Sequence, residues 1–202
     1  MKSMILLAVL FPIMVLKAQE TDISEYVKKG IEMILLEDFE GALDNFNKAI
    51  ESKPSDAESY YYLGEVMFKL GNTKGAMENY NKVIALDSTA HKAFKGRGKL
   101  KAHLKDYRGS VTDFNKAITL KPDFSNAYFD RGLSYSNLKK YEEAIHDFSK
   151  VIQLNPKDAE AYYARGNAKM KYGDADGGCK DWSKAGELGY IKVYDLIRQN
   201  CN

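Results

Sequence analysis

Small and apolar residues recur along this chain at intervals of three and four positions, from residue 23 to about residue 189. That spacing places them on one face of a helix and predicts amphipathic helices instead of strands. The pattern itself recurs every 34 residues, with a glycine at the same place in each period: Gly30, Gly64, Gly98, Gly132 and Gly166. A fixed period of this length predicts stacked units, each of which buries its apolar face against its neighbours.

Further positions of the period hold one kind of residue each. The fourth position is aromatic, the twentieth is small, and the twenty-fourth is a large aromatic. These residues are Tyr26, Tyr60, Phe94, Tyr128 and Tyr162; Ala42, Ala76, Ser110, Ala144 and Gly178; and Phe46, Tyr80, Phe114, Phe148 and Trp182. Positions four and eight lie on one helix face, and positions twenty and twenty-four on another. Each period therefore predicts two helices.

The recurring glycine needs a packing reason, because a glycine inside a helix costs roughly 1 kcal/mol relative to alanine. We expect it to face the small residue at position twenty, so that the two backbones approach closely, while the aromatics fill the space between successive pairs. Prolines predict where the second helices end: Pro54, Pro122 and Pro156. Side chains suited to N-caps predict where they begin: Asp38, Asn72, Asp106 and Asp174.

These columns resemble the tetratricopeptide repeat (TPR) family. The resemblance implies an all-α, right-handed superhelical solenoid whose first helices line a concave groove that binds other proteins. The expected organisation is five TPR helix pairs over 23–189 and a capping helix over 190–202. The pairs are 23–56, 57–90, 91–124, 125–158 and 159–189.

Two departures from the family pattern bear on the structure. The seventh position usually holds leucine, but here it holds Lys29 in the first repeat and Arg97, Arg131 and Arg165 in the last three. In the fifth repeat Tyr190 replaces the terminal proline, so the chain is expected to continue as one more helix. Its apolar residues are predicted to share one face: Ile191, Val193, Tyr194 and Ile197.

The N-terminus carries a separate signal. Lys2 precedes an apolar run over 4–16, and Ala18 offers a small residue before a cleavage site. This pattern predicts a secretory signal peptide over 1–18, with a retained membrane anchor as the alternative. The run is shorter than the roughly 20 residues that span a bilayer. We therefore expect an exported protein, periplasmic or secreted, without membrane insertion after cleavage; small exported bacterial TPR proteins have a similar closing repeat.

Charge excludes some classes of partner. Without Lys2 and Lys17, 28 of the 30 basic residues remain, which equals the 28 acidic residues. General affinity for nucleic acid or a membrane surface rests on a basic excess, and neither partner is expected.

The two cysteines, Cys179 and Cys201, lie near the C-terminal end. Cys179 precedes the turn at Leu188–Gly189 by about nine residues, and Cys201 follows it by about twelve. In an antiparallel helix pair these positions fall within about one turn of each other. An exported chain meets an oxidising compartment, so a disulfide is predicted. Two buried thiols are the alternative.

The groove positions of the family, carried onto this sequence, give a candidate peptide-binding site. A lysine stripe lies in its middle, with aromatics on either side, which suits an extended peptide that has an acidic group and apolar side chains. The predicted site residues are Tyr61, Tyr62, Lys92, Lys95, Lys99, Phe129, Asp130, Tyr163 and Asn167. In the first repeat the corresponding face is apolar, which suits either docking or packing: Val27, Ile31, Ile34 and Leu35.

Catalysis finds little support. His91, His103 and His146 occupy unrelated positions of the period, without metal-ligand spacing. Phosphate-binding and nucleophile motifs are also missing from the sequence. No enzyme activity, cofactor or metal is expected. The predicted function is a scaffold that binds a segment of another envelope protein. The alternatives are a self-assembling homo-oligomer and a subunit that binds a small ligand or glycan on its groove tyrosines.

Overall fold

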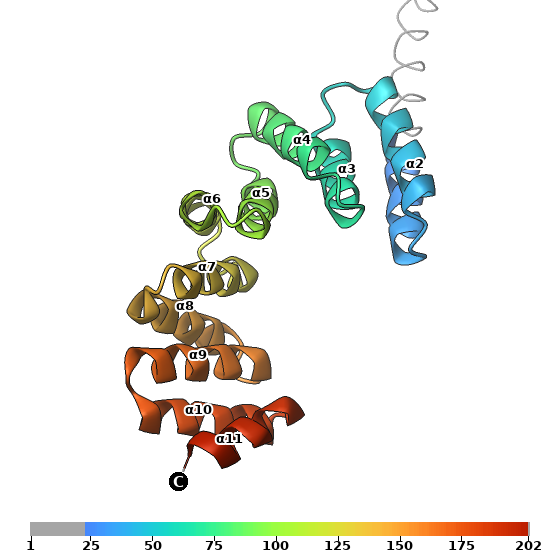
Figure 1. Ribbon diagram of the computed structural model, residues 1–202. Helices are drawn as coiled ribbons and strands as arrows, with labels where there is room; N and C mark the ends of the chain where they lie inside the picture. Colours follow the sequence, from blue (N-terminus) through green and yellow to red (C-terminus); the bar gives the residue numbers. More distant parts are fainter. Residues whose placement is uncertain (1–22, 202) are drawn as a thin grey trace, which may run out of the picture. The chain divides into compact units, whose positions relative to one another are not determined.

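The computed structural model describes residues 23–201, and the predicted signal peptide over 1–18 lies outside them. The chain divides into two compact units, one that ends at Thr89 and one that begins at Ala90. Within the described residues all regular structure is helical, as the sequence predicts. Residues 23–35 are helical and precede the labelled helices of the first unit (Figure 1): α2 Phe39–Ser52, α3 Ala57–Lys69 and α4 Thr73–Leu86.

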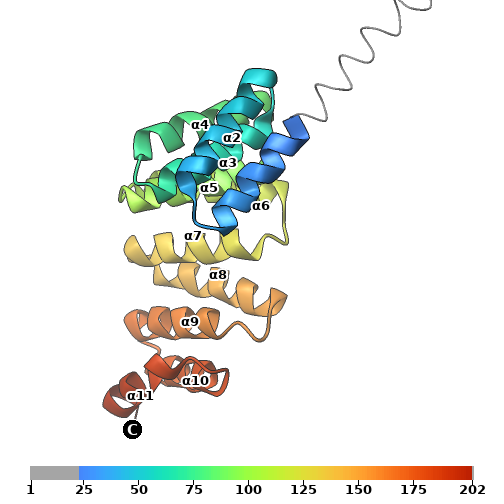
Figure 2. The ribbon, with the colours of Figure 1, turned by 90° about the vertical axis from the view of Figure 1, so that its right-hand side faces the viewer.

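The second unit begins with six helices of 13 or 14 residues and ends with a short pair of elements. The six are α5 His91–His103, α6 Tyr107–Leu120, α7 Ser125–Asn137, α8 Tyr141–Leu154, α9 Ala159–Tyr172 and α10 Ala175–Glu187. A 3₁₀ turn, η1 Ile191–Val193, then leads into α11 Tyr194–Asn200. Each of the six helices packs on the next along the chain, and successive layers from α7 to α10 can be followed in Figure 2.

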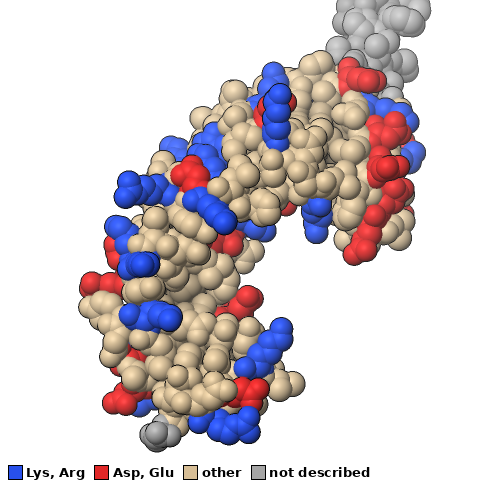
Figure 3. Space-filling view, in the orientation of Figure 1, with Lys and Arg blue, Asp and Glu red and all other residues tan. Residues whose placement is uncertain are grey.

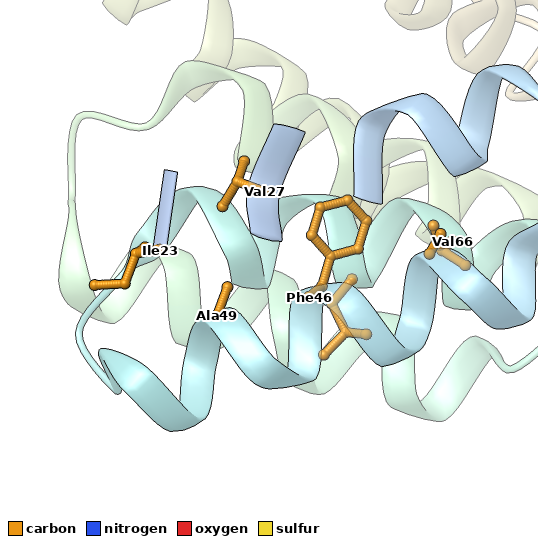
Figure 4. Packing of buried hydrophobic residues seen from close by; sticks show 7 residues of the cluster. Ile23, Val27, Phe46, Ala49 and Val66 are labelled. Carbon is orange, nitrogen blue, oxygen red and sulfur yellow. The ribbon is translucent and has the colours of Figure 1, made fainter. Parts of the chain in front are cut away.

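The core of the first unit joins three helices. Ile23 and Val27 of the helix over 23–35 lie beside Ala49 and Phe46 of α2 (Figure 4). Val66 of α3 belongs to the same buried cluster. Phe46 and Ala49 are fully buried, so the burial of this aromatic ring is a main source of apolar stabilisation here.

Side-chain caps begin four of the five second helices, as predicted. Asp38, Asn72, Asp106 and Asp174 each accept a hydrogen bond of 2.9 Å from the backbone N–H three residues later. This bond satisfies one of the four backbone donors that a helix start leaves without a partner. The second helices also end before each predicted proline, since α2, α6 and α8 stop two residues ahead of it.

The recurring glycine faces the aromatic at position twenty-four of its own repeat, which corrects the expectation that it faces the small residue at position twenty. A Cβ added to Gly30 would lie 2.6 Å from the Phe46 ring, and one added to Gly132 would lie 2.8 Å from the Phe148 ring. The aromatics thus fill the space within a helix pair, not only between pairs. At Gly166 the expected contact is present as well, because its Cβ would also meet the carbonyl oxygen of Gly178, the small residue at position twenty, at 3.1 Å.

The apolar residues predicted to share one face of the last segment differ in exposure. Val193 is fully buried, but Ile191 is 76% exposed and Tyr194 is 55% exposed. Tyr194 keeps one contact, since its ring covers the backbone at Gly186.

Candidate functional site

The first helices of the second unit, α5, α7 and α9, form a row in which α5 contacts α7 and α7 contacts α9. Most residues of the predicted groove lie on this row: Lys92, Lys95, Lys99, Phe129, Asp130, Tyr163 and Asn167. Tyr61 and Tyr62 lie on α3 of the first unit. The predicted site therefore divides between the two units, each with its own geometry.

The row brings Lys95 and Asp130 together. The Lys95 Nζ lies 3.7 Å from an Asp130 carboxylate oxygen, and both side chains are only 20% exposed. Burial raises the pKa of Asp130, and the charges of Lys95 and Lys99 only partly oppose that shift. The neighbouring Glu160 raises it further. Lys92 and Lys99 are exposed, so they supply the available positive charge of α5.

The aromatic and amide residues of the row are partly engaged within the protein. The Phe129 ring makes an edge contact with the Phe148 ring, their centroids 5.5 Å apart. Tyr163 stacks on Tyr190, which lies in the turn after α10, with centroids 4.6 Å apart. The side-chain oxygen of Asn167 accepts a 3.0 Å hydrogen bond from the Trp182 indole. These contacts hold the three side chains in fixed positions beside the lysines.

A cavity of about 240 Å³ opens between the ends of α7 and α9. Its lining residues are Ser136, Asn137, Tyr141, Asn167, Ala168 and Lys171. The Lys171 ammonium is the one charged group among these residues, and the others with polar side chains supply hydroxyl and amide groups. The volume suits one large side chain of a ligand, and small-molecule sites are commonly larger.

In the first unit the predicted groove tyrosines pack on one another and on the core. Tyr62 stacks on Phe46 with ring centroids 5.5 Å apart, and Tyr61 makes an edge contact with Tyr62 at 5.3 Å. Burial, followed by the charge of Glu65, raises the pKa of Tyr61 well above its usual value. Both rings are half-buried and do not project as free platforms.

The apolar face predicted for the first repeat is mostly packed. Val27 is buried, and Ile31 and Ile34 pack against the core cluster, whereas Leu35 is 80% exposed. A cavity of about 390 Å³ borders Val27 and Ile31 and has a rim of both charges. The rim's charged residues are Lys28, Lys53, Asp56 and Glu58. Acidic side chains also gather over α2 on the face shown in Figure 3.

The arginines at position seven form a set of buried ion pairs that the sequence analysis missed. Arg97, Arg131 and Arg165 each bind the aspartate 16 residues later through two hydrogen bonds of 2.6 to 2.9 Å: Asp113, Asp147 and Asp181. The aspartates are almost fully buried. A signal was present, because arginine and aspartate recur together in the last three repeats at this fixed separation.

Arg131 and Arg165 also reach the preceding repeat. An Arg131 Nη1 donates to the side-chain oxygen of Asn115 at 2.6 Å, and an Arg165 Nη1 donates to the Ser149 hydroxyl at 3.1 Å. Burial alone would lower the pKa of Arg131, but the hydrogen bonds and charge of Asp147 outweigh it and raise the pKa. The arginines therefore fix neighbouring repeats in register.

The predicted cysteine pair lies at the C-terminal end of the second unit. The Cys179 and Cys201 sulfurs are 2.00 Å apart, which is a bonding distance, and their Cα atoms are 5.7 Å apart. Within the described part of the chain, no helix is long and apolar enough to cross a membrane. Among the same residues, no group of three or more metal-ligating side chains is placed to hold a metal ion.

Comparisons with solved structures find close likeness in fold. The crystal structure of MamA protein is 26% identical, with a TM-score of 0.73 over 85% of this chain and 94% of that one. PilF of Pseudomonas aeruginosa is 21% identical, with a TM-score of 0.79 over 90% of this chain and 86% of that one. YrrB, described as a TPR protein with an unusual peptide-binding site, is 21% identical, with a TM-score of 0.71 over 86% of this chain and 90% of that one.

Sequence comparisons identify the family. The comparison with curated proteins returned no match. Four family models described as tetratricopeptide repeat or TPR repeat match residues 34–71, 57–90, 96–124 and 125–158, and none describes a catalytic family. Together they cover more than half of the chain, and the predicted TPR solenoid class is confirmed. The chain therefore belongs to the tetratricopeptide repeat family, whose members typically act as non-catalytic scaffolds for protein interaction.

Proposed function

We propose that this protein is a non-catalytic adaptor that binds an extended segment of another protein along the row of α5, α7 and α9. The observation that carries the proposal is the order of charges on that row. Lys95 and Asp130 neutralise each other, so the exposed Lys92 and Lys99 leave α5 positive. Glu160 makes the start of α9 negative. A ligand with an acidic group over α5 fits this order.

Contacts within the protein hold two side chains of the proposed binding surface in place before a ligand arrives. Tyr163 is held by Tyr190 and Asn167 by Trp182, so a ligand meets side chains that have already lost their rotamer freedom. Prior ordering lowers the entropic cost of binding. The 240 Å³ cavity beside Asn167 and Lys171 is sized for one ligand side chain. The acidic group therefore lies over α5 and a larger polar or aromatic side chain enters the cavity.

Fluorescence anisotropy with labelled peptides of one length tests this. The probes are a peptide that alternates glutamate with phenylalanine, its lysine counterpart, and a neutral serine counterpart. The acidic peptide should bind, and Lys99→Glu should raise its Kd at least tenfold, about 1.4 kcal/mol. Added salt should weaken binding as well, because the lysines are exposed.

The matched control is Lys116→Glu, which reverses an exposed charge on α6 of the same repeat. It should leave the Kd unchanged. Equal binding of the acidic and lysine peptides, or equal losses for the two variants, would contradict a site on the row. If no peptide binds, concentration-dependent self-association or binding of a glycan becomes the better explanation, and light scattering separates these two.

We further infer that the adaptor works in the bacterial cell envelope. The placement of Cys179 on α10 beside Cys201 at the end of α11 supports an oxidising compartment, where such pairs persist as disulfides. The predicted signal peptide supports the same location. Cell fractionation followed by alkylation of free thiols tests both: the protein should appear outside the cytoplasm with both thiols protected. Reduced protein confined to the cytoplasm would refute export.

A further inference from the structure

The Arg–Asp pairs of the last three repeats differ in the presence of a second cation beside the aspartate. In the third repeat the Lys101 ammonium lies 2.7 Å from Asp113, the partner of Arg97. In the fifth repeat the Lys169 ammonium lies 2.9 Å from Asp181. Each of these buried aspartates is thus neutralised by an arginine and also contacted by a lysine at position eleven.

In the fourth repeat Tyr135 stands at position eleven. Asp147 is bound by Arg131, and the His146 Nδ1 lies 3.7 Å from one of its carboxylate oxygens. A cavity of about 360 Å³ borders Asp147 at this place. Its walls are Arg131, Tyr135, Glu142, Glu143, His146 and Asp147, all from α7 and α8.

The charges around this cavity favour a cation. Arg131 neutralises Asp147, and Lys140 neutralises Glu143 through an ion pair of 3.0 Å. The exposed Glu142 is left as the excess charge of the rim. At the equivalent position the third repeat carries Arg108, so the same region there is strongly basic. The fifth repeat carries Asp176 there, but its own Lys169 already contacts the buried aspartate. The fourth repeat is thus the one that combines an acidic rim with a position eleven that holds no lysine.

The walls also suit an alkylammonium better than a bare ion. The Tyr135 ring already faces two cations of the protein, with Arg131 at 5.7 Å and Lys140 at 5.9 Å from its centroid. An ammonium group gains from an aromatic face, and its alkyl stem gains from apolar contact. Lys101 and Lys169 show within the same chain that an ammonium fits against the corresponding aspartates.

We propose that the cavity between α7 and α8 binds the primary ammonium group of a lysine side chain of a partner protein. The guest lysine takes the place that Lys101 and Lys169 occupy in the neighbouring repeats. The site is formed by residues at positions of the period that do not face the groove, so it lies apart from the row of groove residues. These residues are Arg131, Tyr135, Glu142 and Asp147, at positions seven, eleven, eighteen and twenty-three. It is therefore independent of the function proposed above.

Titrations followed by two-dimensional amide NMR of the whole chain test this. The probes are a capped Gly-Lys-Gly peptide, the same peptide with an acetylated lysine ammonium, and 1,5-diaminopentane as a free diamine. The lysine peptide should shift the amide signals of Tyr135 and His146, and acetylation should abolish the shifts. Binding of the diamine in addition would assign the site to alkylammonium groups in general, whereas peptide binding alone would assign it to a protein partner.

The decisive variant is Tyr135→Lys, which gives the fourth repeat the residue of the third and fifth. It should keep the fold, fill the cavity and weaken the lysine peptide at least tenfold. The control is Tyr172→Lys, which adds the same charge at a 56% exposed position on α9 and should leave binding unchanged. Shifts that persist with the acetylated peptide or in Tyr135→Lys, or a lysine peptide that causes no shift, would overturn the proposal.

Discussion

Removal of Arg131 should destabilise the protein more than removal of Arg165, although both arginines occupy position seven. Arg131 donates to the two Asp147 oxygens at 2.8 and 2.6 Å and to Asn115 at 2.6 Å. Asp147 is 1% exposed. The substitution Arg131→Met keeps the alkyl volume but leaves a buried carboxylate with only His146 nearby, 3.7 Å away.

The magnitude follows from the partners that remain. Removing one partner of a buried ion pair costs about 3–5 kcal/mol, mainly because the other charge stays buried. In Arg165→Met the Lys169 ammonium still lies 2.9 Å from Asp181, so the cost should be nearer that of a lost charged hydrogen bond, about 1.5–3 kcal/mol. A gap of about 2 kcal/mol corresponds to about 4–8 °C in melting temperature for a chain of this size.

The assay is thermal and urea unfolding followed by the helical circular dichroism of both variants. A second comparison isolates the buried charge. The double variant Arg131→Met with Asp147→Leu should recover most of the lost stability, because it removes both charges from the interior. Equal losses for Arg131→Met and Arg165→Met, or a double variant no more stable than the single one, would refute the reasoning.

Four further predictions concern single positions. Gly132→Ala should lower the melting temperature, because a Cβ 2.8 Å from the aromatic ring of its repeat costs about 1–3 kcal/mol, more than the gain in helix propensity; an unchanged or higher melting temperature would contradict it. Lys105→Gly and Lys139→Gly should each raise the free energy of unfolding in urea by up to about 1 kcal/mol, since both residues have positive φ values of 64° and 59°. A lower free energy of unfolding in either variant would oppose this. Cys201→Ser should cost the oxidised chain about 3 kcal/mol on the chain-entropy model; if the difference persists after reduction, the bond is not its cause. Burial raises the pKa of Asp130, so the folded state holds this proton more tightly than the unfolded state, and stability falls as pH rises above the unfolded pKa of about 3.9. Asp130→Asn should therefore be more stable than the parent at neutral pH and should lose this advantage below about pH 3.9. Thermal melts across pH that show a less stable variant at neutral pH would exclude the mechanism.

Local rules in the sequence were enough to predict the helices. The glycine and aromatic columns, the capping side chains and the prolines act within one repeat, and they mark the starts of four second helices and the ends of three. The contact of Gly132 was assigned to the wrong partner, because spacing identifies a helix face but not the side chain that meets it. The 76% exposure of Ile191 was not predicted for a related reason: an apolar pattern identifies a helix face but not what covers it.

The candidate site could be predicted only as a set of positions. The sequence placed Lys95 and Asp130 on facing helices through the family resemblance, but it did not indicate that they pair and so leave Lys92 and Lys99 as the net charge. The Arg–Asp pairs lie 16 residues apart on two helices, a separation that only the packing of those helices brings into contact.

The sequence by itself determined the repeat, the family and the all-α class, because a fixed period constrains every unit to the same fold. The tertiary structure decided which charges cancel. The negative charge of a carboxylate such as Asp147 is compensated only when a cation lies within a few ångströms of it. The packing of α7 against α8 decides which cations come that close. The replacement of lysine by Tyr135 at position eleven could therefore be interpreted only when the structure showed the buried Asp147 beside it.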